Sequence, residues 1–420
     1  MKKILALLLA AIMVLSMAAC TEAGPTTTNP SGNASTPTPE KPQEVTLKVW
    51  GPSEDQATDT SWLQTRLAAF EKAHPEYKIT WQLGVCPEGD AKTMVTTDVS
   101  AAADVFMYAN DQLGTLIEAE ALAELGGSYL DGIKANYSQT LIDTVTYTDG
   151  GVYGFPFTNN TWFLYYDKSV YTEEDVKSME TLLEKGKVAF PITNSWYIWS
   201  FYAAAGGTLF GPNGIDADAG IELGDKATDV TKYLVNMCAH PNFVNDVDNA
   251  GLDGIKDGSI KAYFDGSWNA KPVKDALGDN MGAAQLPTIT INGEQLQMKA
   301  FAGSKAIGVN RQSKNMKVAL MVAEFLASPE SQLAKYEMRG VIPCASKLLE
   351  NETIKADIIA SAEANTMNKT ACGQPTIPEM SNYWTPAANM GTAIYNKEVT
   401  LDNAQEQTEL LESALNKTGL

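Results

Sequence analysis

The sequence is poor in histidine and has no closely spaced cysteines of the CxxC type, and these shortages exclude several classes of function. Only two histidines, His74 and His240, occur among 420 residues, and the five cysteines form no CxxC pair. Zinc sites are built from such ligands at short spacing, so neither a metal nor another cofactor is expected. The G-x-S-x-G turn that carries the nucleophile of many hydrolases is also missing.

Basic clusters and long apolar runs are scarce as well. The chain has 51 acidic against 31 basic residues, a formal net charge of −20. Such a surface repels nucleic acid and anionic lipid, so nucleic acid is excluded as a partner. The one extended apolar run, from Ile4 to Val14, is too short to span a bilayer as a helix. Any membrane contact is therefore expected at the N-terminus alone.

That N-terminus, MKKILALLLAAIMVLSMAAC, has the layout of a secretory signal at residues 1–19. Its end, LSMAAC, resembles the bacterial lipobox, which implies cleavage before Cys20 and lipid attachment to the Cys20 sulfur. The alternative is an ordinary signal peptide with an incidental cysteine. Residues 20–43 are rich in Thr, Pro and Ser and lack large apolar side chains, which is typical of a disordered tether. The predicted location is the outer face of the cytoplasmic membrane.

Four cysteines remain beyond the tether, and an exported chain permits disulfides between them. Three pairings are open, and we favour Cys344 with Cys372 because only 27 residues lie between them and prolines flank both. Free thiols are the alternative.

Apolar periodicity predicts an α/β fold. Strands are expected at 45–51, 77–84 and 103–109, with helical spacing between and after them. Strands and helices keep alternating beyond this region, which is typical of mainly parallel sheets flanked by helices. The roughly 375 residues after the tether are more than one core usually supports, so two lobes are expected.

Aromatic residues are concentrated in one stretch, NSWYIWSFY at 194–202. The stretch follows a predicted strand at 187–192 and begins a helix that Ser195 can cap, and ligands of open α/β sheets bind at this edge. Trp196 and Tyr197, in the first turn, are predicted to face a ligand. Trp199, Phe201 and Tyr202 lie further along and are predicted to be core. Trp268 repeats this strand-to-helix placement within 260–277.

Four further motifs carry a family resemblance. They are ADVFMYANDQLGTLIEAEALAEL, DGGVYGFPF with LYYDKSVY, YFDGSWN, and IPEMSNYWTPA. In this order they resemble segments of the maltose-binding proteins, which belong to the carbohydrate-binding proteins of ABC transporters. The resemblance spans roughly residues 44–420. It implies two α/β lobes joined by a multi-segment hinge, with the ligand bound in the cleft between them.

The same resemblance implies lobe boundaries and a ligand wall. The chain would pass from one lobe to the other near residues 159–161, 285–287 and 330–334. One lobe would then consist of residues 44–158 plus 288–330, and the other of residues 162–284 plus 335–420. The matched wall consists of Tyr108, Asp111, Asn160, Asn194, Trp196, Tyr197, Trp268 and Trp384. Glu54 and Asp55, at the end of the first strand, are expected to reach the cleft too. Gln112, Asn160 and Asn194 depart from charged residues of the family, which leaves the exact sugar open.

These residue types suit a sugar. A pyranose offers apolar faces to aromatic rings and a rim of hydroxyls to carboxylates and amides. The resemblance therefore implies a monomeric, non-enzymatic receptor that captures an oligosaccharide, first of all a maltooligosaccharide, for an ABC permease. The alternatives are a receptor for another oligosaccharide or solute, and a secreted glycoside hydrolase, whose paired carboxylates are easily hidden among 51 acids. Polyamine or iron sites would need carboxylate, tyrosine or histidine clusters in place of tryptophans.

Overall fold

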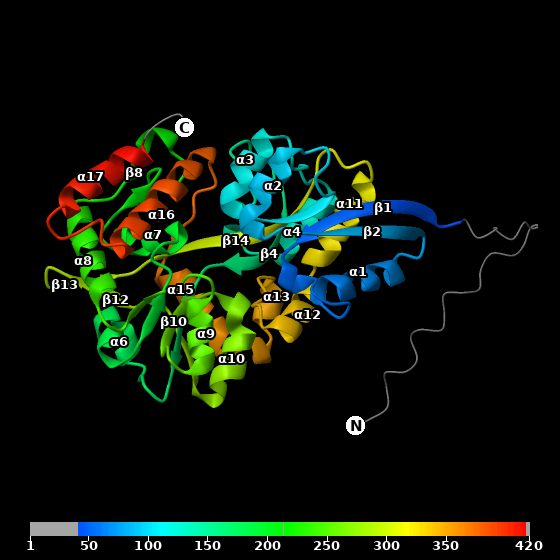
Figure 1. Ribbon diagram of the computed structural model, residues 1–420. Helices are drawn as coiled ribbons and strands as arrows, with labels where there is room; N and C mark the ends of the chain where they lie inside the picture. The colour runs from blue at the N-terminus through cyan, green and yellow to red at the C-terminus, as the bar shows by residue number, and fades with distance from the viewer. Residues whose placement is uncertain (1–40, 213, 417–420) are drawn as a thin grey trace, which may run out of the picture. The chain divides into compact units, whose positions relative to one another are not determined.

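Two mixed β-sheets, each covered by helices, form the part of the chain that the structure describes. The computed structural model describes residues 41–212 and 214–416, so the expected signal at 1–19, Cys20 and most of the tether lie outside it. The chain from Pro42 onward forms one unit, in which each sheet has its own hydrophobic core (Figure 1). We call these halves the first and second lobe. Within the described ranges, no helix is long and apolar enough to cross a membrane.

The first lobe is built on a six-stranded sheet of order β15-β14-β3-β1-β2, with β4 also paired to β14. Its strands are β1 (Gln43–Gly51), β2 (Tyr77–Val85), β3 (Val105–Ala109), β4 (Phe155–Asn160), β14 (Ala300–Val309) and β15 (Ala371–Gly373). Its helices are α1 (Trp62–Ala73), α2 (Ala91–Thr97), α3 (Leu113–Glu118), α4 (Ser128–Asn136), α5 (Gln139–Asp143), α11 (Met316–Ala327), α12 (Pro329–Arg339) and α13 (Ser346–Leu349), followed by α14 (Glu352–Lys355). All five residues of β3 are buried, as expected of a strand with neighbours on both sides.

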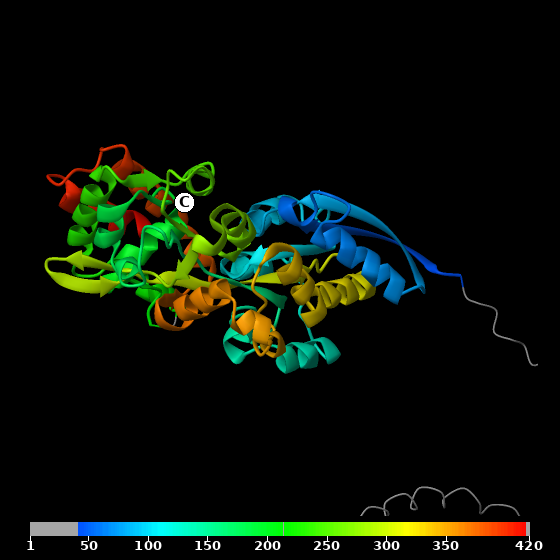
Figure 2. The same ribbon diagram turned by 90° about the horizontal axis from the view of Figure 1, so that it is seen from below.

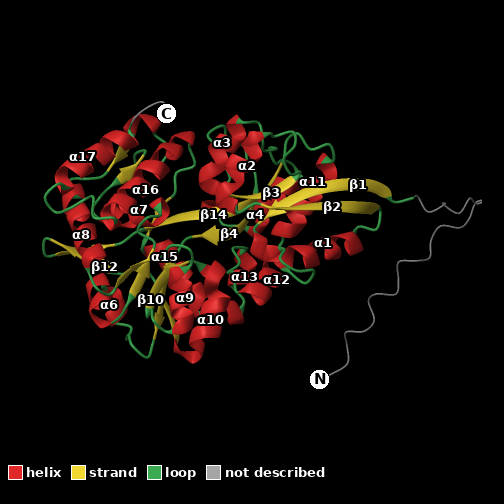
Figure 3. Cartoon of the chain, in the orientation of Figure 1, coloured by secondary structure: helices red, strands yellow, loops and turns green. Residues whose placement is uncertain are grey.

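The second lobe is built on a five-stranded sheet of order β11-β5-β10-β6-β9. Its strands are β5 (Phe163–Asp167), β6 (Val188–Phe190), β9 (Phe243–Asn245), β10 (Ala262–Asp265) and β11 (Met281–Ala284), joined by the hairpins β7 (Thr208–Leu209) with β8 (Ile221–Glu222) and β12 (Thr288–Ile291) with β13 (Glu294–Gln297). Its helices are α6 (Met179–Lys185), α7 (Ser195–Ala204), α8 (Ala227–Ala239), α9 (Ala250–Asp257), α10 (Ala270–Leu277), α15 (Ile358–Lys369), α16 (Ser381–Tyr395) and α17 (Ala404–Leu415). Alternate residues of β5 enter cores on opposite faces of this sheet, so both faces are covered (Figure 3).

The α/β prediction is confirmed, and both sheets are mixed: the first has three parallel and two antiparallel strand pairings, and the second has two of each. In the first, β14 runs antiparallel to β3 and β4; in the second, β5 runs antiparallel to β10 and β11. Both strands enter their sheets directly from the other lobe, β5 immediately after β4 and β14 after the β12–β13 hairpin. A strand that arrives without a helical crossover is free to run opposite to its neighbours.

Two of the expected lobe boundaries are wrong. Ile289 and Met298 lie in the second core, and the β12–β13 hairpin stands with the second lobe in both views (Figure 1, Figure 2). The crossing takes place inside β14, where Phe301 belongs to the second core and Ile307 to the first. Helix α12 still packs on α1 and α11 of the first lobe, and Leu348 of α13 still packs against its core, so the chain does not leave that lobe near 330–334. A crossing within a continuous strand leaves no break for sequence reasoning to find.

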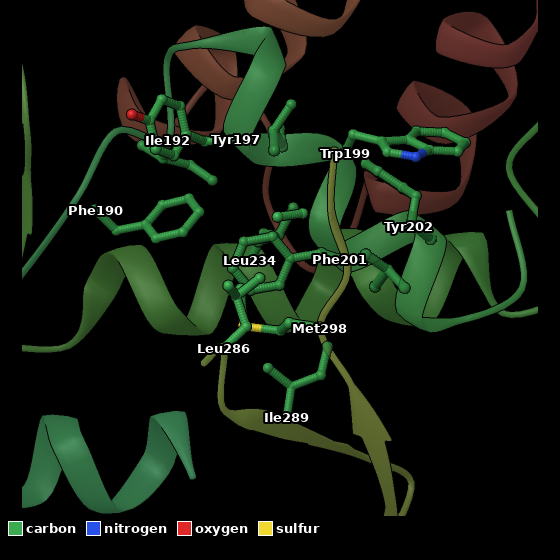
Figure 4. Close-up of a cluster of buried hydrophobic side chains, with 14 of the residues drawn as sticks. Phe190, Ile192, Tyr197, Trp199, Phe201, Tyr202, Leu234, Leu286, Ile289 and Met298 are labelled. Atoms are coloured by element: carbon green, nitrogen blue, oxygen red, sulfur yellow. The ribbon is translucent and has the colours of Figure 1, made fainter. Parts of the chain in front are cut away.

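The aromatic stretch contributes chiefly to the second core. Trp199, Phe201 and Tyr202 are buried there, which confirms their predicted place. Figure 4 shows the Phe201 ring beside Leu234 and Met298. The cap of α7 is Asn194 and not Ser195, since the Asn194 side chain accepts a hydrogen bond from the backbone N–H of Trp196 at 2.9 Å.

The predicted disulfide is wrong. The four cysteines of the described chain, Cys86, Cys238, Cys344 and Cys372, are all free. Cys344 is buried in the core of the first lobe, whereas Cys372 lies on β15 and packs against the second core, where its thiol donates to the Ala300 carbonyl. Short separation in sequence did not bring them together because their side chains pack against different cores.

Candidate ligand-binding site

Several segments that follow strand ends converge between the lobes. The short 3₁₀ helix η3 (Asn110–Gln112) follows β3 of the first lobe and carries Asp111. Helix α7 follows β6 of the second lobe and carries Trp196, and the 3₁₀ helix η6 (Ser267–Asn269) follows β10 and carries Trp268. The predicted strand-to-helix placement of both tryptophans is therefore present. This edge of a sheet is where α/β folds bind ligands.

Side chains of both lobes meet at this point. The rings of Trp196 and Trp268 lie 6.1 Å apart between centroids at 39°. The indole N–H of Trp196 donates to the Gln374 side-chain oxygen at 2.8 Å. Burial raises the pKa of Asp111, and the nearby Gln374 side chain lowers it slightly. Asp111, Trp196 and Trp268 were predicted from sequence, whereas Gln374 was not. It stands in a short loop after β15, a place without periodicity, so no sequence signal identified it.

Three charged side chains, those of Lys305, Glu88 and Arg339, lie close to Trp268. The Lys305 ammonium of β14 lies 5.1 Å from the Trp268 ring centroid and 3.4 Å from the carboxylate of Glu88. The guanidinium of Arg339, at the end of α12, donates to the Trp268 carbonyl at 3.4 Å. A cavity of about 20 Å³ lies beside these charged groups. It is lined by Trp268, which is half-buried, and by Glu54, which is exposed. A ring face of Trp268 is thus already in contact with a cation of the opposite lobe.

A buried aspartate holds the turn that presents Trp268. Asp265 accepts hydrogen bonds from the Asn269 side chain at 2.6 Å and the Gly266 N–H at 2.8 Å. The hydroxyls of Tyr263 and Tyr197 donate to it as well. Sequence reasoning did not single out Asp265, although its place directly before Gly266 in YFDGSWN was a usable turn signal.

Three of the predicted ligand residues are structural. Tyr108 is fully buried in the first core because it lies on the central strand β3. Tyr197 is 6% exposed, packs on Trp162 and commits its hydroxyl to Asp265. Asp55 is fully buried and pairs with Lys335 and with Arg339. These side chains shape the site from behind and present no free polar group to a ligand.

The remaining predicted residues have mixed surroundings. Asn160 ends β4 opposite Gly303 of β14. Asn194 is exposed, and its side-chain oxygen caps α7. Trp384, in the first turn of α16, is half-buried and contacts the rings of Phe301 and Tyr383, a different pair from Trp196 and Trp268.

The largest cavity lies beside this cluster and has a volume of about 1030 Å³. Residues of both lobes line it, among them Asn159, Tyr147, Trp199, Glu363 and Gln374. None of the ten ligand residues predicted from sequence is part of its wall. Two neighbouring places between the lobes are therefore candidates for a ligand. One is the surface beside Trp196 and Trp268, and the other is this cavity, which Tyr147 and Trp199 line.

Comparison with known proteins identifies the family. A family model described as bacterial extracellular solute-binding protein matches residues 65–364. The chain belongs to this family. A solved structure with acarbose has 48% sequence identity to this solute-binding protein and a TM-score of 0.85, and the match covers 88% of this chain and 98% of that chain. These lobes therefore have the architecture of a two-lobed binding protein.

Two curated relatives extend the comparison. A maltooligosaccharide ABC transporter solute-binding lipoprotein of Streptococcus pneumoniae is 28% identical over 348 residues, which covers 79% of this chain and 80% of the relative. A galactooligosaccharide-binding protein of Bacillus subtilis is 26% identical over 433 residues, 96% of each chain.

Three carboxyl groups of this solute-binding protein have raised pKa values: the half-buried Asp111 and the buried Asp265 and Glu363. Burial raises the pKa of Asp111 to about 7, that of Asp265 to about 6 and that of Glu363 to about 7. Glu363, on α15, accepts a hydrogen bond from the Asn159 side chain of β4 at 2.9 Å, and hydrogen bonds from Asn159 and Ser267 partly offset the effect of burial. Glu363 thus joins α15 of the second lobe to β4 of the first through a group with a pKa of about 7.

The protein is expected to lose stability as pH rises from 5 to 8. A carboxyl whose folded-state pKa exceeds its unfolded value stabilises the fold fully below the unfolded pKa, and this contribution is lost as pH rises through the folded pKa. Asp111, Asp265 and Glu363 act in the same direction, so the melting temperature should fall over this interval. Calorimetric melting of the ligand-free protein tests this. Glu363→Gln keeps an oxygen for Asn159 and should flatten the profile; a melting temperature that rises with pH would contradict the assignment.

Proposed function

We propose that this protein is the lipid-anchored receptor of a carbohydrate ABC importer and binds an oligosaccharide between its lobes. The observation that supports the proposal is the cluster of Trp196 and Trp268 with Asp111 and Gln374, drawn from both lobes. Indole rings stack on the apolar faces of a pyranose, and carboxylate and amide groups bind its hydroxyls.

Binding between the lobes gives the mechanism. A ligand that touches Asp111 on one side and the tryptophans on the other makes its full set of contacts only when the lobes are together. It therefore shifts the population toward the closed form by its differential affinity for that form. The strands β4 and β14 carry the chain between lobes and provide the hinge. The permease then recognises the closed form of the receptor.

The preferred ligand is a maltooligosaccharide. The structure with acarbose and the maltooligosaccharide receptor of Streptococcus pneumoniae are both similar to this chain and support an α-glucan. The galactooligosaccharide-binding protein of Bacillus subtilis supports a second candidate, a galactooligosaccharide. Asn160 and Asn194, where the maltose binders often have charged residues, are compatible with either sugar because amides bind hydroxyls of both.

The anchor and the partner complete the proposal. Lipid on Cys20 holds the protein at the outer face of the cytoplasmic membrane, and the residues before β1 tether it there. The protein acts as a monomer with the permease subunits as its partner, and it performs no chemistry on the sugar. A glycoside hydrolase of the same shape would release reducing ends, so incubation of the protein with maltotetraose tests this point: any sustained release contradicts pure binding.

Calorimetric titration of residues 42–420 tests the ligand. We expect micromolar or tighter binding of maltotetraose and none of cellotetraose or xylotetraose. A galactooligosaccharide belongs in the same series: binding of this sugar alone would retain the receptor function and replace the α-glucan. Heat with none of the four would refute an oligosaccharide receptor of this type.

A further inference from the structure

The ring of Trp268 is held by contacts from both lobes. Within its own turn the ring packs against Gly266, where a Cβ would lie 2.1 Å from the ring atom Cζ3, so only glycine fits there. From the other lobe, the Lys305 ammonium lies over the ring at 5.1 Å from its centroid. Lys305 belongs to the first-lobe sheet, where it lies opposite Ala109 of β3, whereas Trp268 packs against the second core. A lysine of one lobe therefore covers a tryptophan of the other.

The Lys305 ammonium is withdrawn from water and fixed by a carboxylate. The Lys305 side chain is 20% exposed, and its ammonium lies 3.4 Å from a carboxylate oxygen of Glu88, whose side chain is 8% exposed. A cation with little contact with water is attracted to an indole more strongly than an exposed one. The space left beside the ring is about 20 Å³, which has room for about one water molecule and not for a pyranose.

The other cations beside Trp268 are bound elsewhere. The guanidinium of Arg339 donates to the Asp55 carboxylate at 2.8 Å and contacts Trp268 only through its backbone carbonyl, at 3.4 Å. The ammonium of Lys335 pairs with the same carboxylate of Asp55. Removal of the Lys305 ammonium should therefore free the ring of Trp268 without disturbing these ion pairs.

We propose that Lys305 is an internal competitor of the ligand, whose ammonium covers the Trp268 ring in the ligand-free protein and is displaced when a sugar unit stacks there. This inference rests on the proposed oligosaccharide function and names a residue that sets its affinity. The electron-rich face of an indole attracts a lysine ammonium and also carries the apolar face of a pyranose, so one excludes the other. The displaced ammonium keeps Glu88 as its partner, and it covers the ring again when the sugar leaves.

The test is calorimetric titration of Lys305→Ala with maltotetraose. Binding should become roughly fivefold tighter, since a largely desolvated cation no longer competes for the ring. Lys305→Arg should bind more weakly than the wild type, because a guanidinium stacks on aromatic faces. Lys305→Ala also leaves Glu88 without its cation, so a double variant with Glu88→Gln removes both charges and should show the same gain. Unchanged or weaker binding in both alanine variants would overturn the proposal.

Lys317→Ala is the matched control. Lys317 of α11 is also a first-lobe lysine over an aromatic ring, at 6.0 Å from the ring centroid of Tyr77, but that ring belongs to the first core. The variant removes the same charge from the same lobe and should leave the affinity unchanged. A gain equal to that of Lys305→Ala would mean that net charge sets the affinity, and this result too would overturn the proposal.

A spectroscopic measurement separates this inference from the proposed function. In protein made with lysine that carries ¹³C at Cε, the Lys305 signal is assigned by its absence in Lys305→Ala. The ring current of Trp268 should shift this signal upfield in the ligand-free protein, and saturating maltotetraose should return it to the position of a lysine with no ring beside it. Binding heat without a change in this signal would overturn the displacement and leave the receptor intact. An absence of heat would refute the receptor function itself.

Discussion

Trp196→Ala is expected to weaken maltooligosaccharide binding by roughly 30-fold or more without unfolding the protein. Aromatic side chains at the centre of a binding site contribute at least about 2 kcal/mol when truncated. Trp196 supplies a stacking face, contacts Trp268 and donates to Gln374, so its loss removes the sugar platform and one bond of the amide. The side chain is only half-buried at the edge of the second core, and stability should change much less than affinity. Calorimetric titration and thermal melting measure the two effects.

Tyr147→Ala is the matched control for this experiment. Tyr147 is half-buried and lines the cavity of about 1030 Å³, where none of the ligand residues predicted from sequence lies. If the sugar stacks on Trp196 and Trp268, Tyr147→Ala should retain wild-type affinity. The reverse result, with binding lost in Tyr147→Ala and kept in Trp196→Ala, would move the sugar to the larger cavity.

Asp55→Ala is expected to destabilise the protein by about 3–5 kcal/mol, because it leaves a buried cation without its partner. Asp55 is fully buried and Lys335 is 5% exposed, and their ion pair joins the 3₁₀ helix Ser53–Asp55 to α12. The Lys335 ammonium also lies 4.3 Å from the Phe157 ring centroid and 4.7 Å from that of Trp62, so it has little contact with water. Urea denaturation of the ligand-free protein measures the loss.

Two further variants test this interpretation. Lys78→Ala breaks the exposed pair of Lys78 with Glu44 and should cost less than about 1 kcal/mol. Adding Lys335→Met to Asp55→Ala should recover much of the lost stability, since the uncompensated charge is then gone. If Asp55→Ala keeps its stability and loses only sugar affinity, Asp55 is a ligand residue after all and its structural assignment fails.

Local patterns in the sequence located the elements well. The alternation in VTLKV matches β1, and Ser61 precedes α1, which ends before Pro75. The junction residues Trp196 and Trp268 could be identified because each follows a strand and begins a helix. Such signals can be recognised without a structure because they depend only on residues that are close together in the sequence.

The sequence did not reveal that some polar and aromatic residues predicted to bind a ligand are buried in the protein. Tyr108 precedes Asp111 by only three residues, yet its ring is in the core while Asp111 is half-buried. The difference arises because Tyr108 lies on β3, which has strands on both sides, whereas Asp111 lies in the 3₁₀ helix that follows the strand. Asp55 pairs with a lysine 280 positions away. A carboxylate on a loop has the same appearance in sequence whether its partner is a ligand or a distant lysine.

The sequence by itself determined that this is an acidic α/β protein with aromatic residues at strand-to-helix junctions, and its N-terminus resembles that of a lipoprotein. Periodicity, capping residues and composition act over short distances, so they can be read without a structure. Only the tertiary structure decided where the chain changes lobes, which aromatics are core, and that Trp196 donates a hydrogen bond to Gln374. These features depend on contacts between residues that are far apart in sequence, and the order of strands in the sheets sets such contacts.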